Sequence, residues 1–391
     1  MKKNESLEPS YIELSKSALK QNILFLRSCL NDGVIFSSVI KGNAYGHGIS
    51  AFIPMAEDCG IRHFSVFSAN EAEGVLKFKK QKDTSVMIMG MIRDSELDWA
   101  IKNGIEFYLF EEERLNRAIS VAEKLGTQAK IHLQIETGMN RTGFEECEWT
   151  DMINRVNKNS EFLELKGIST HFAGAESVAN YYRIQNQNEM FKKALAVAEK
   201  ILDKMPTIHA SSSAASLTYP EMQYDMVRIG IAQFGFWPSR ETYMHQVKEN
   251  KFNQNEDPLN RVITWKSEVM NTKWVKQGDF IGYGNVYMAG RKMNIATVPI
   301  GYSHGFGRNL TNTGYVLING ERAGVVGLVN MNMITVDVTD IPNVKKGDEV
   351  VLIGVQGDNE ISVASFSEMT NNLNYELLTR LPASIPRIVV D

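Results

Sequence analysis

Cysteine is scarce in this 391-residue chain: Cys29, Cys59 and Cys147 are its only thiols, and their spacing matches no zinc site. This argues against a disulfide framework and favours a reducing compartment, so we expect a cytoplasmic protein. Long hydrophobic runs are missing too. No segment approaches the ~18 apolar residues of a membrane span, and the first residues, MKKNESLEPSY, lack the apolar core of a signal peptide. We therefore expect no membrane partner.

An excess of one charge is also absent. Lys and Arg number 42 against 46 Asp and Glu, for a formal net charge of -4. This balance argues against a nucleic-acid partner bound through a strong positive field. The composition is otherwise that of a globular protein, with 43% hydrophobic and 23% charged residues. The length exceeds that of a usual single core, which predicts two domains.

Short apolar runs alternate with helical patterns through residues 1–240. The runs are rich in β-branched and aromatic residues, which is typical of strands buried on both faces. They cover 34–41, 63–68, 85–90, 105–111, 130–137, 165–171, 207–212 and 226–235. The clearest helical patterns cover 14–30, 112–125 and 188–202, with Asp94 and Asn70 as expected N-caps of two further helices.

A repeated strand–helix alternation predicts a parallel sheet, and eight such units favour a (β/α)₈ barrel, the TIM-barrel form of the α/β class. The alternative is a doubly wound open sheet, which would show a GxGxxG turn after its first strand. The turn here is KGNAYGHG, at 41–48, which does not match.

The pattern changes after Pro258, where strand-like runs are separated by turn signals and long helical patterns are scarce. The runs cover 262–274, 294–299, 315–318, 322–329, 333–338 and 349–353. We expect a mostly-β second domain at 258–391, after a barrel at 1–240. The polar, poorly periodic segment 238–258 is the expected linker.

Reactive side chains follow several predicted barrel strands, at the end where barrel active sites lie. Lys41 ends the first strand. It is either a surface cation or a Schiff-base lysine whose pKa is lowered by burial. Arg228 either forms an ion pair or points at a cofactor, and Ser213 either caps a helix or donates to a phosphate. Taken alone, His171 can equally be a residue that makes a structural hydrogen bond, and Tyr283 can be an ordinary tyrosine of a strand or turn.

Nine segments, taken in order, resemble the alanine racemase family, whose members join a barrel that binds pyridoxal 5'-phosphate (PLP) to a β domain. SVIKGNAYGHG at 38–48 is similar to the family's PLP attachment motif. The other segments are ETGMNRTGF, STHFAGAE, HASSSAAS, VRIGIAQFG, IGYGNVY, VPIGYSHGFGR, VVGLVNMNMITVDVTD and NYELLTRL. The resemblance implies an isomerase that interconverts L- and D-alanine, supplies D-alanine for peptidoglycan and acts as a homodimer.

The resemblance also implies a role for each matching residue. Lys41 corresponds to the lysine that binds PLP covalently, and Tyr283 to a tyrosine that works from the opposite face in a partner subunit's site. Arg228 corresponds to the arginine facing the pyridine nitrogen, Arg141 to one near the phenolic oxygen and the substrate carboxylate, and His171 to the histidine linking arginine and tyrosine. The implied phosphate contacts are Tyr45, Ser213, Gly230 and Ile231, and the implied substrate-entrance residues are Tyr302 and Met331.

These roles make chemical sense together. Racemisation needs two acid–base groups on opposite sides of a flat cofactor, here Lys41 and Tyr283. A tyrosine is a weak base at neutral pH, so we expect nearby cations, His171 among them, to favour its anion. An arginine cannot readily accept a proton from the pyridine ring, so Arg228 should suppress transamination.

Four positions depart from the usual pattern of the family. Gln134 stands where many members carry a carbamylated lysine, Asn332 and His304 replace aspartates, and Ala383 replaces a tyrosine on the phosphate. Such changes could admit amino acids larger than alanine. The alternatives are therefore a broad-specificity or serine-type racemase, then a PLP-dependent decarboxylase, then a non-catalytic PLP-binding protein.

Overall fold

The computed structural model describes the chain except residues 1–7, 250, 253–255 and 371–373. Its contacts divide the chain into two compact units. The barrel unit comprises Ala18–Lys41 and Ile53–Asn260, and the β unit comprises Met1–Ser17, Gly42–Phe52 and Arg261–Asp391. This division departs from the predicted boundaries of 1–240 and 258–391, because two N-terminal segments belong to the β unit.

Eight parallel strands form the barrel unit's sheet, in the order β8-β7-β6-β5-β4-β3-β2-β9. The two end strands approach each other where Ser212 and Arg228 form a parallel bridge, and Arg228 N donates to Ser211 O at 2.9 Å. The sheet is therefore a nearly closed barrel, which confirms the predicted fold class. The strands are β2 (Ile35–Val39), β3 (His63–Val66), β4 (Ser85–Ile88), β5 (Glu106–Leu109), β6 (Ala129–Gln134), β7 (Leu163–Ser169), β8 (Thr207–His209) and β9 (Met226–Ile229).

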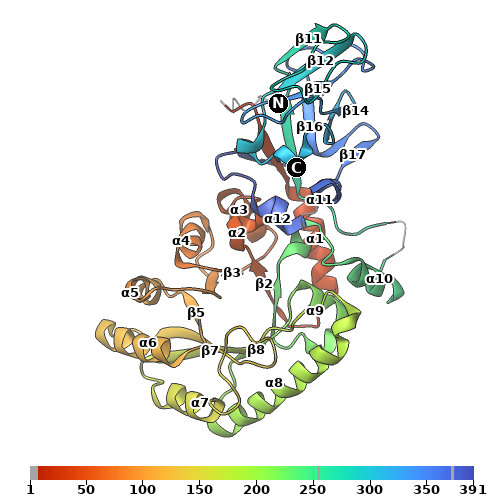
Figure 1. Ribbon diagram of the computed structural model, residues 1–391. Coiled ribbons are helices and arrows are strands. Elements are labelled where there is room, and N and C mark those ends of the chain that lie inside the picture. The colour runs from red at the N-terminus through yellow and green to blue at the C-terminus, as the bar shows by residue number, and fades with distance from the viewer. Residues whose placement is uncertain (1–7, 250, 253–255, 371–373) are drawn as a thin grey trace. The chain divides into compact units, whose positions relative to one another are not determined.

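Helices follow the strands, and Figure 1 shows α4 to α8 outside the strands of this sheet. They are α1 (Lys16–Ser28), α2 (Lys41–Tyr45), α3 (Ile49–Asp58), α4 (Ala69–Phe78), α5 (Asp94–Lys102), α6 (Glu112–Leu125), α7 (Trp149–Lys158), α8 (Tyr181–Ile201), α9 (Ser213–Thr218) and α10 (Arg240–Lys248). The prediction for α6 was correct at both ends. Glutamates in its first turn complement the helix dipole, and Gly126 ends it at φ 61°.

Three local predictions were wrong. The N-caps of α4 and α5 are Ser68 and Arg93, so the predicted caps Asn70 and Asp94 already lie inside the helices. The predicted linker contains α10, because the Ser239 hydroxyl accepts a hydrogen bond from Thr242 N at 3.1 Å and starts a helix there. Residues 250 and 253–255 of that segment lie outside the described residues.

Two sheets form the core of the β unit. The larger follows the order β14-β13-β16-β10-β1-β18, with β17 on β16, and the smaller is β11-β12-β15. Every pairing is antiparallel except that of β1 with β18. The strands are β1 (Tyr11–Ser15), β10 (Ile263–Glu268), β11 (Asn271–Val275), β12 (Met293–Val298), β13 (Tyr315–Ile318), β14 (Glu321–Gly324), β15 (Ile334–Asp337), β16 (Glu349–Gln356), β17 (Asn359–Ile361) and β18 (Arg387–Val390).

The sequence patterns missed parts of this unit. The predicted run 262–274 is two strands in different sheets, and the helical pattern from residue 14 begins inside β1, whose alternating burial places Ile12 and Leu14 in the core. Helices α11 (Val363–Thr370) and α12 (Asn374–Thr379) were not predicted. Trp265 anchors the core, and its Nε1 donates to Ser10 Oγ at 2.8 Å.

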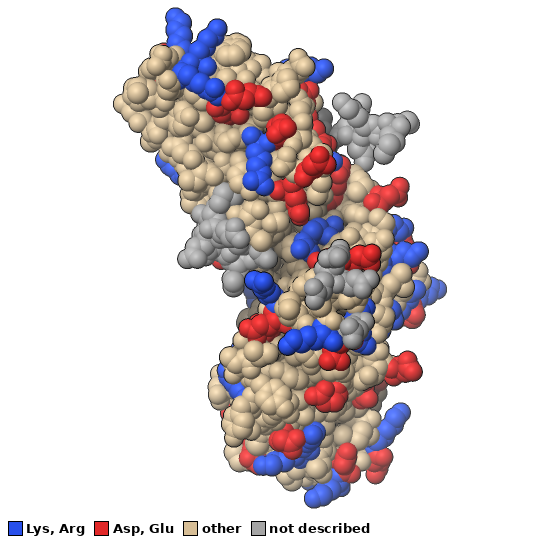
Figure 2. Space-filling view, turned by 90° about the vertical axis from the view of Figure 1, so that its right-hand side faces the viewer, with Lys and Arg blue, Asp and Glu red and all other residues tan. Residues whose placement is uncertain are grey.

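Charges of both signs are mixed on the molecular surface shown in Figure 2, and neither sign covers this face. Over the residues that the structure describes, no helix is both long enough and apolar enough to cross a bilayer.

Candidate active site

Lys41 lies two residues after Val39, the last residue of β2, and Ile40 stands between them. The Lys41 side chain is exposed to solvent. Its pKa is nevertheless lower than that of an ordinary lysine, because of the groups that surround its ammonium. Partial burial is the largest cause, the positive charges of Arg141 and Arg228 add to it, and Glu71 opposes it. A lowered pKa increases the fraction of free amine, which is the form that attacks an aldehyde.

Arg228, on β9, is buried inside the barrel with 5% of its surface exposed. Its Nη1 donates to His209 Nδ1 at 2.6 Å. Its Nη2 donates to Ala210 O at 2.7 Å and to Thr170 O at 2.8 Å, and contacts His171 Nδ1 at 3.3 Å. None of these bonds uses the Nε–H. The guanidinium is thus fixed in orientation and keeps a donor for a ligand atom.

His171 is a neutral imidazole in this arrangement. Burial, and then the charges of Arg228, Arg141 and Lys41, lower its pKa to about 3. Because an arginine only donates, His171 Nδ1 accepts from Arg228 and the imidazole proton lies on Nε2. The expectation that His171 supplies a positive charge was therefore wrong: it offers a hydrogen-bond donor instead.

Arg141 lies in a tight turn after β6. Glu136 holds this turn, because its carboxylate accepts hydrogen bonds from Gly138 N at 2.5 Å and Arg141 N at 3.2 Å. Gln134, the neutral residue at the position of the carbamylated lysine, accepts a bond from Thr142 Oγ1 at 3.3 Å. Arg141 itself is exposed, so its guanidinium is accessible to a solute.

The ends of β8 and β9 meet at the residues predicted to contact a phosphate. Ser213 Oγ accepts a hydrogen bond from Gly230 N at 2.8 Å, and Ile231 follows directly and is buried. The Ser213 hydroxyl and the Gly230 N–H are thus bonded to each other where β8 and β9 end, in the unit that also holds Lys41, Arg141 and Arg228. These residues fit PLP, because the Lys41 amine suits its aldehyde and the surplus positive charge suits its phosphate and phenolic oxygen.

The turn after Lys41 is left-handed. Gly42, Asn43, Ala44 and Tyr45 have φ values of 64°, 55°, 54° and 50°, a conformation that residues other than glycine rarely adopt in succession. Hydrogen bonds hold it, from Gly46 N to Gly42 O and from the Ile49 amide to Asn43 Oδ1, both at 3.0 Å. This strained segment belongs to the β unit, where the Tyr45 ring is 6.1 Å from the Tyr375 ring.

Tyr283 lies at the tip of a hairpin in the β unit. Phe280 and Met288 form the bridge at its base, and Gly282 and Gly284 on either side of the tyrosine have φ values of 78° and 66°. The tyrosine is 74% exposed. Its hydroxyl group is therefore accessible to solvent.

The predicted substrate-entrance residues, Tyr302 and Met331, lie on two loops that are joined through backbone hydrogen bonds. Ser303 N donates to Met331 O at 3.0 Å, and Asn332 Nδ2 donates to Ser303 Oγ at 3.0 Å. His304 Nδ1 accepts from Gly301 N at 3.2 Å. The departures Asn332 and His304 thus bond within the loops, and Ala383 lies in an exposed turn.

The structure brings seven of the predicted residues to one end of the barrel unit and leaves four in the β unit. The first set is Lys41, Arg141, His171, Ser213, Arg228, Gly230 and Ile231, and the second is Tyr45, Tyr283, Tyr302 and Met331. A buried polar chain that ends at Arg228 was not predicted, and it comprises His209, His132, Glu106 and His63. Charged or imidazole side chains inside otherwise apolar strands were the signal that could have revealed it.

Two family models match the chain in succession. The alanine racemase N-terminal domain matches residues 14–238, and the alanine racemase C-terminal domain matches residues 262–389. Curated relatives include an alanine racemase of Leptospira interrogans, 33% identical over 98% of this chain and 96% of its own length. One of Halothermothrix orenii is 33% identical over 97% and 96%.

Solved structures agree along the whole chain. The alanine racemase of Streptomyces lavendulae has a TM-score of 0.87 at 26% identity, covering 99% of this chain and 98% of its own. That of Bacillus anthracis, solved with bound L-Ala-P, has a TM-score of 0.87 at 28% identity over 98% and 95%. That of Bartonella henselae, with covalently bound pyridoxal phosphate, has a TM-score of 0.82 at 25% identity over 98% and 100%. This chain belongs to the alanine racemase family.

Proposed function

We propose that this protein interconverts L- and D-alanine with PLP held on Lys41. The observation that carries the proposal is the setting of that amine: its pKa is lowered, and it lies within electrostatic reach of Arg141 and Arg228 at the end of a barrel strand. When bound, PLP supplies a conjugated ring that acidifies the α-proton of an amino acid attached to it. The protein's residues must then hold the substrate and move the proton.

Lys41 and Tyr283 are the proposed acid–base pair. Lys41 Nζ takes or returns the α-proton on one face, and Tyr283 Oη does so on the other, which inverts the centre without turning the substrate over. Arg141 is exposed and cationic, so it suits the substrate carboxylate. His171, neutral with its proton on Nε2, can donate to the phenolate oxygen of Tyr283 and so favour its anion.

Arg228 is the proposed partner of the pyridine nitrogen. Its buried guanidinium is held by four acceptors and cannot give up a proton readily, so it would offer a bound pyridine nitrogen only a hydrogen-bond donor. Arg228 would thereby favour return of the proton to the substrate carbon over transamination. Ser213, Gly230, Ile231 and Tyr45 are the proposed phosphate contacts.

The proposed active unit is a homodimer with composite sites, because Tyr283 is presented on an exposed hairpin away from its own unit's core. A complementation experiment tests this. Lys41→Ala and Tyr283→Phe should each have little or no activity as homodimers. Mixing them under exchange conditions should restore about 25% of wild-type activity, since half of the dimers are mixed and each has one intact site. No restoration would place both residues in one subunit's site.

Substrate range and cofactor attachment can be measured together. Borohydride reduction with PLP should fix the cofactor on Lys41, as peptide mass spectrometry would show. A racemase assay with alanine, serine, lysine and arginine should give the highest kcat/KM for alanine. A higher value for another amino acid would assign a broad-specificity racemase, and carbon dioxide release would assign a decarboxylase. Cys29, Cys59 and Cys147 form no disulfide with one another, and on that basis we propose the cytoplasm as the compartment.

A further inference from the structure

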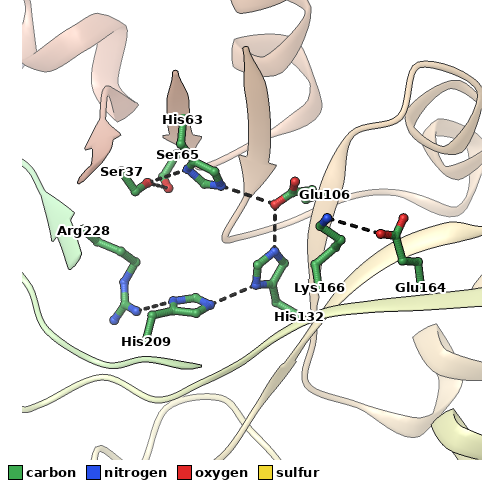
Figure 3. Close-up of polar contacts among 9 residues, drawn as sticks. All are labelled: Ser37, His63, Ser65, Glu106, His132, Glu164, Lys166, His209 and Arg228. Atoms are coloured by element: carbon green, nitrogen blue, oxygen red, sulfur yellow. Dashed lines mark hydrogen bonds and ion pairs between the residues drawn. The ribbon is translucent and has the colours of Figure 1, made fainter. Parts of the chain in front are cut away.

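A continuous chain of buried polar groups crosses the interior of the barrel and ends at Arg228 (Figure 3). Arg228 Nη1 is 2.6 Å from His209 Nδ1, and His209 Nε2 is 2.9 Å from His132 Nδ1. His132 Nε2 is 2.9 Å from Glu106 Oε2, which also lies 3.3 Å from His63 Nε2. The members come from β9, β8, β6, β5 and β3, so the barrel itself assembles the chain.

The direction of every hydrogen bond from Arg228 to Glu106 is fixed by the chemistry of its two ends. An arginine can only donate, so His209 Nδ1 carries no proton and accepts. The proton of neutral His209 then lies on Nε2 and is donated to His132 Nδ1. His132 in turn carries its proton on Nε2 and donates it to Glu106, which as a carboxylate only accepts. Donors and acceptors match at each step.

Burial keeps the members in these protonation states. Burial and the charge of Arg228 lower the pKa of His209 well below its usual value, and burial lowers that of His132. Burial alone would raise the pKa of Glu106, but the hydrogen bonds from His132 and His63 reverse this and hold it below its usual range. Two neutral imidazoles thus separate a buried cation from a buried anion.

The absence of a side chain at Gly167 makes room for this chain of polar groups. A Cβ placed on Gly167 of β7 would lie 2.3 Å from His132 Nδ1, so no side chain is possible there while His132 keeps its position. The His132 and His209 rings meet edge to face, with centroids 5.0 Å apart, and the Tyr108 ring lies about 6 Å from each. Neither imidazole can easily turn to exchange its two nitrogens.

We infer that Glu106 and His132 are positioning residues for Arg228, because together they force His209 to present a lone pair to the guanidinium. If His132 carried its proton on Nδ1, it would face the Nε2–H of His209, and His209 could respond only by moving its own proton to Nδ1. Two donors would then meet at Arg228, which would lose one of the bonds that orient it. The consequence for catalysis rests on the proposed function of Arg228, whereas the proton order does not.

At the other end of the chain, His63 can carry its ring proton on either nitrogen. His63 Nδ1 is 2.8 Å from Ser37 Oγ, which is 2.5 Å from Ser65 Oγ. Hydroxyls can donate or accept, so this pair can reverse its direction without moving. A Glu106→Gln variant can therefore keep the chain in order: its amide oxygen accepts from His132, and its NH₂ donates to His63, whose proton shifts to Nδ1.

The direct test is the ¹⁵N NMR spectrum of the histidine-labelled holoenzyme, in which the two ring nitrogens of each tautomer have distinct shifts. His132 and His209 should both be neutral with the proton on Nε2 in the wild type and in Glu106→Gln. In Glu106→Met, which removes the acceptor, at least one of them should shift to the Nδ1–H form. A wild-type His209 that is charged or protonated on Nδ1 would overturn the inference, whether or not the protein is a racemase.

Kinetics and absorbance then test the effect on Arg228. Glu106→Met should lower kcat for L-alanine roughly tenfold or more with a smaller change in KM, and should shift the visible band of bound PLP, since Arg228 loses one buried charge-assisted bond. Glu106→Gln should retain both properties to within about threefold. The matched control is Glu164→Gln, which removes a carboxylate that pairs with Lys166 at 3.2 Å beside the chain but outside it, and should change neither (Figure 3). Equal losses in the Met and Gln variants, with wild-type tautomers in both, would contradict a positioning role.

Discussion

Arg387 Nη2 donates to the carbonyl oxygen of Gly46 at 2.8 Å, which ties β18 to the turn that follows Lys41. The same guanidinium also donates to Pro382 O at 2.6 Å. The turn is left-handed and includes three residues other than glycine, each of which is strained by roughly 1–2 kcal/mol. Contacts within the β unit therefore stabilise the backbone conformation of the turn that follows Lys41, the proposed catalytic lysine.

The first prediction concerns that turn. Gly46→Ala places a Cβ 1.9 Å from Leu378 O, at a φ of +80°, so both strain and a backbone clash result. We expect a loss of about 3 kcal/mol or more in the free energy of unfolding, with weaker PLP retention. Gly33→Ala is the matched control, because Gly33 has the same φ but nothing within 4 Å of the new Cβ. Its loss should stay near 1–2 kcal/mol. Equal losses in urea titrations would show that the clash does not matter.

The second prediction separates chemistry from folding at Tyr283. Because the residue is 74% exposed, Tyr283→Phe should unfold at the wild-type urea concentration and still bind PLP. Racemisation of alanine should fall by about 100-fold or more, the usual range for loss of an acid–base group. Tyr182→Phe, at a tyrosine with 76% exposure in the barrel unit, should have wild-type activity. Full activity in Tyr283→Phe would remove this tyrosine from the mechanism.

The third prediction concerns reaction specificity at Arg228. A carboxylate there would keep the pyridine nitrogen protonated, so Arg228→Glu should increase the amount of pyruvate and pyridoxamine phosphate formed per racemisation event. Arg228→Gln removes the charge without supplying a carboxylate and should give a smaller increase. Both products can be measured by chromatography after incubation with L-alanine. The hypothesis fails if the by-product ratio of Arg228→Glu equals that of the wild type.

The fourth prediction is acid sensitivity. The pKa values of buried His47 and His171 are lowered to about 4 and about 3, from 6.5 in an unfolded chain. Below pH 6.5 the unfolded state therefore binds more protons than the folded state. As the pH decreases, the free energy of unfolding decreases by about 1.4 kcal/mol per pH unit for each such histidine. The loss should begin near pH 6.5 and continue to the folded-state values. Urea midpoints at pH 7 and pH 5 measure it, and His47→Asn should reduce the difference. Identical midpoints would contradict the assigned burial.

Much of the fold could be predicted from the sequence, because each barrel strand is a short apolar run and each connection has helical periodicity. β1 was not, since its five residues run directly into α1 and its partners, β10 and β18, lie more than 240 residues away. Local patterns carry no information about such pairings. The capping error at α5 arose because that helix starts at Arg93, which is not a usual N-cap residue, whereas at α4 Ser68 and Asn70 are of equal N-cap preference and the sequence does not decide between them.

The sequence also allowed only some of the candidate site residues to be predicted. Lys41, Arg141 and Arg228 were identified because motifs surround them. His132 and Glu106 were missed because each is a single polar residue within an apolar strand, and the pairing of β5 with β6 that makes them neighbours cannot be seen in the sequence of either strand. The neutral state of His171 could not be predicted either, because it depends on burial and on cations from three other segments.

In the proposed mechanism, Lys41 and Tyr283 exchange the α-proton of alanine with solvent from opposite faces. The most direct measurement is the incubation of the PLP-loaded protein with L-alanine in D₂O, followed by NMR and chiral chromatography at low conversion. We expect D-alanine that carries deuterium at Cα, while the remaining L-alanine is largely protiated. Product D-alanine that retains the original proton, or no D-alanine at all, would contradict it.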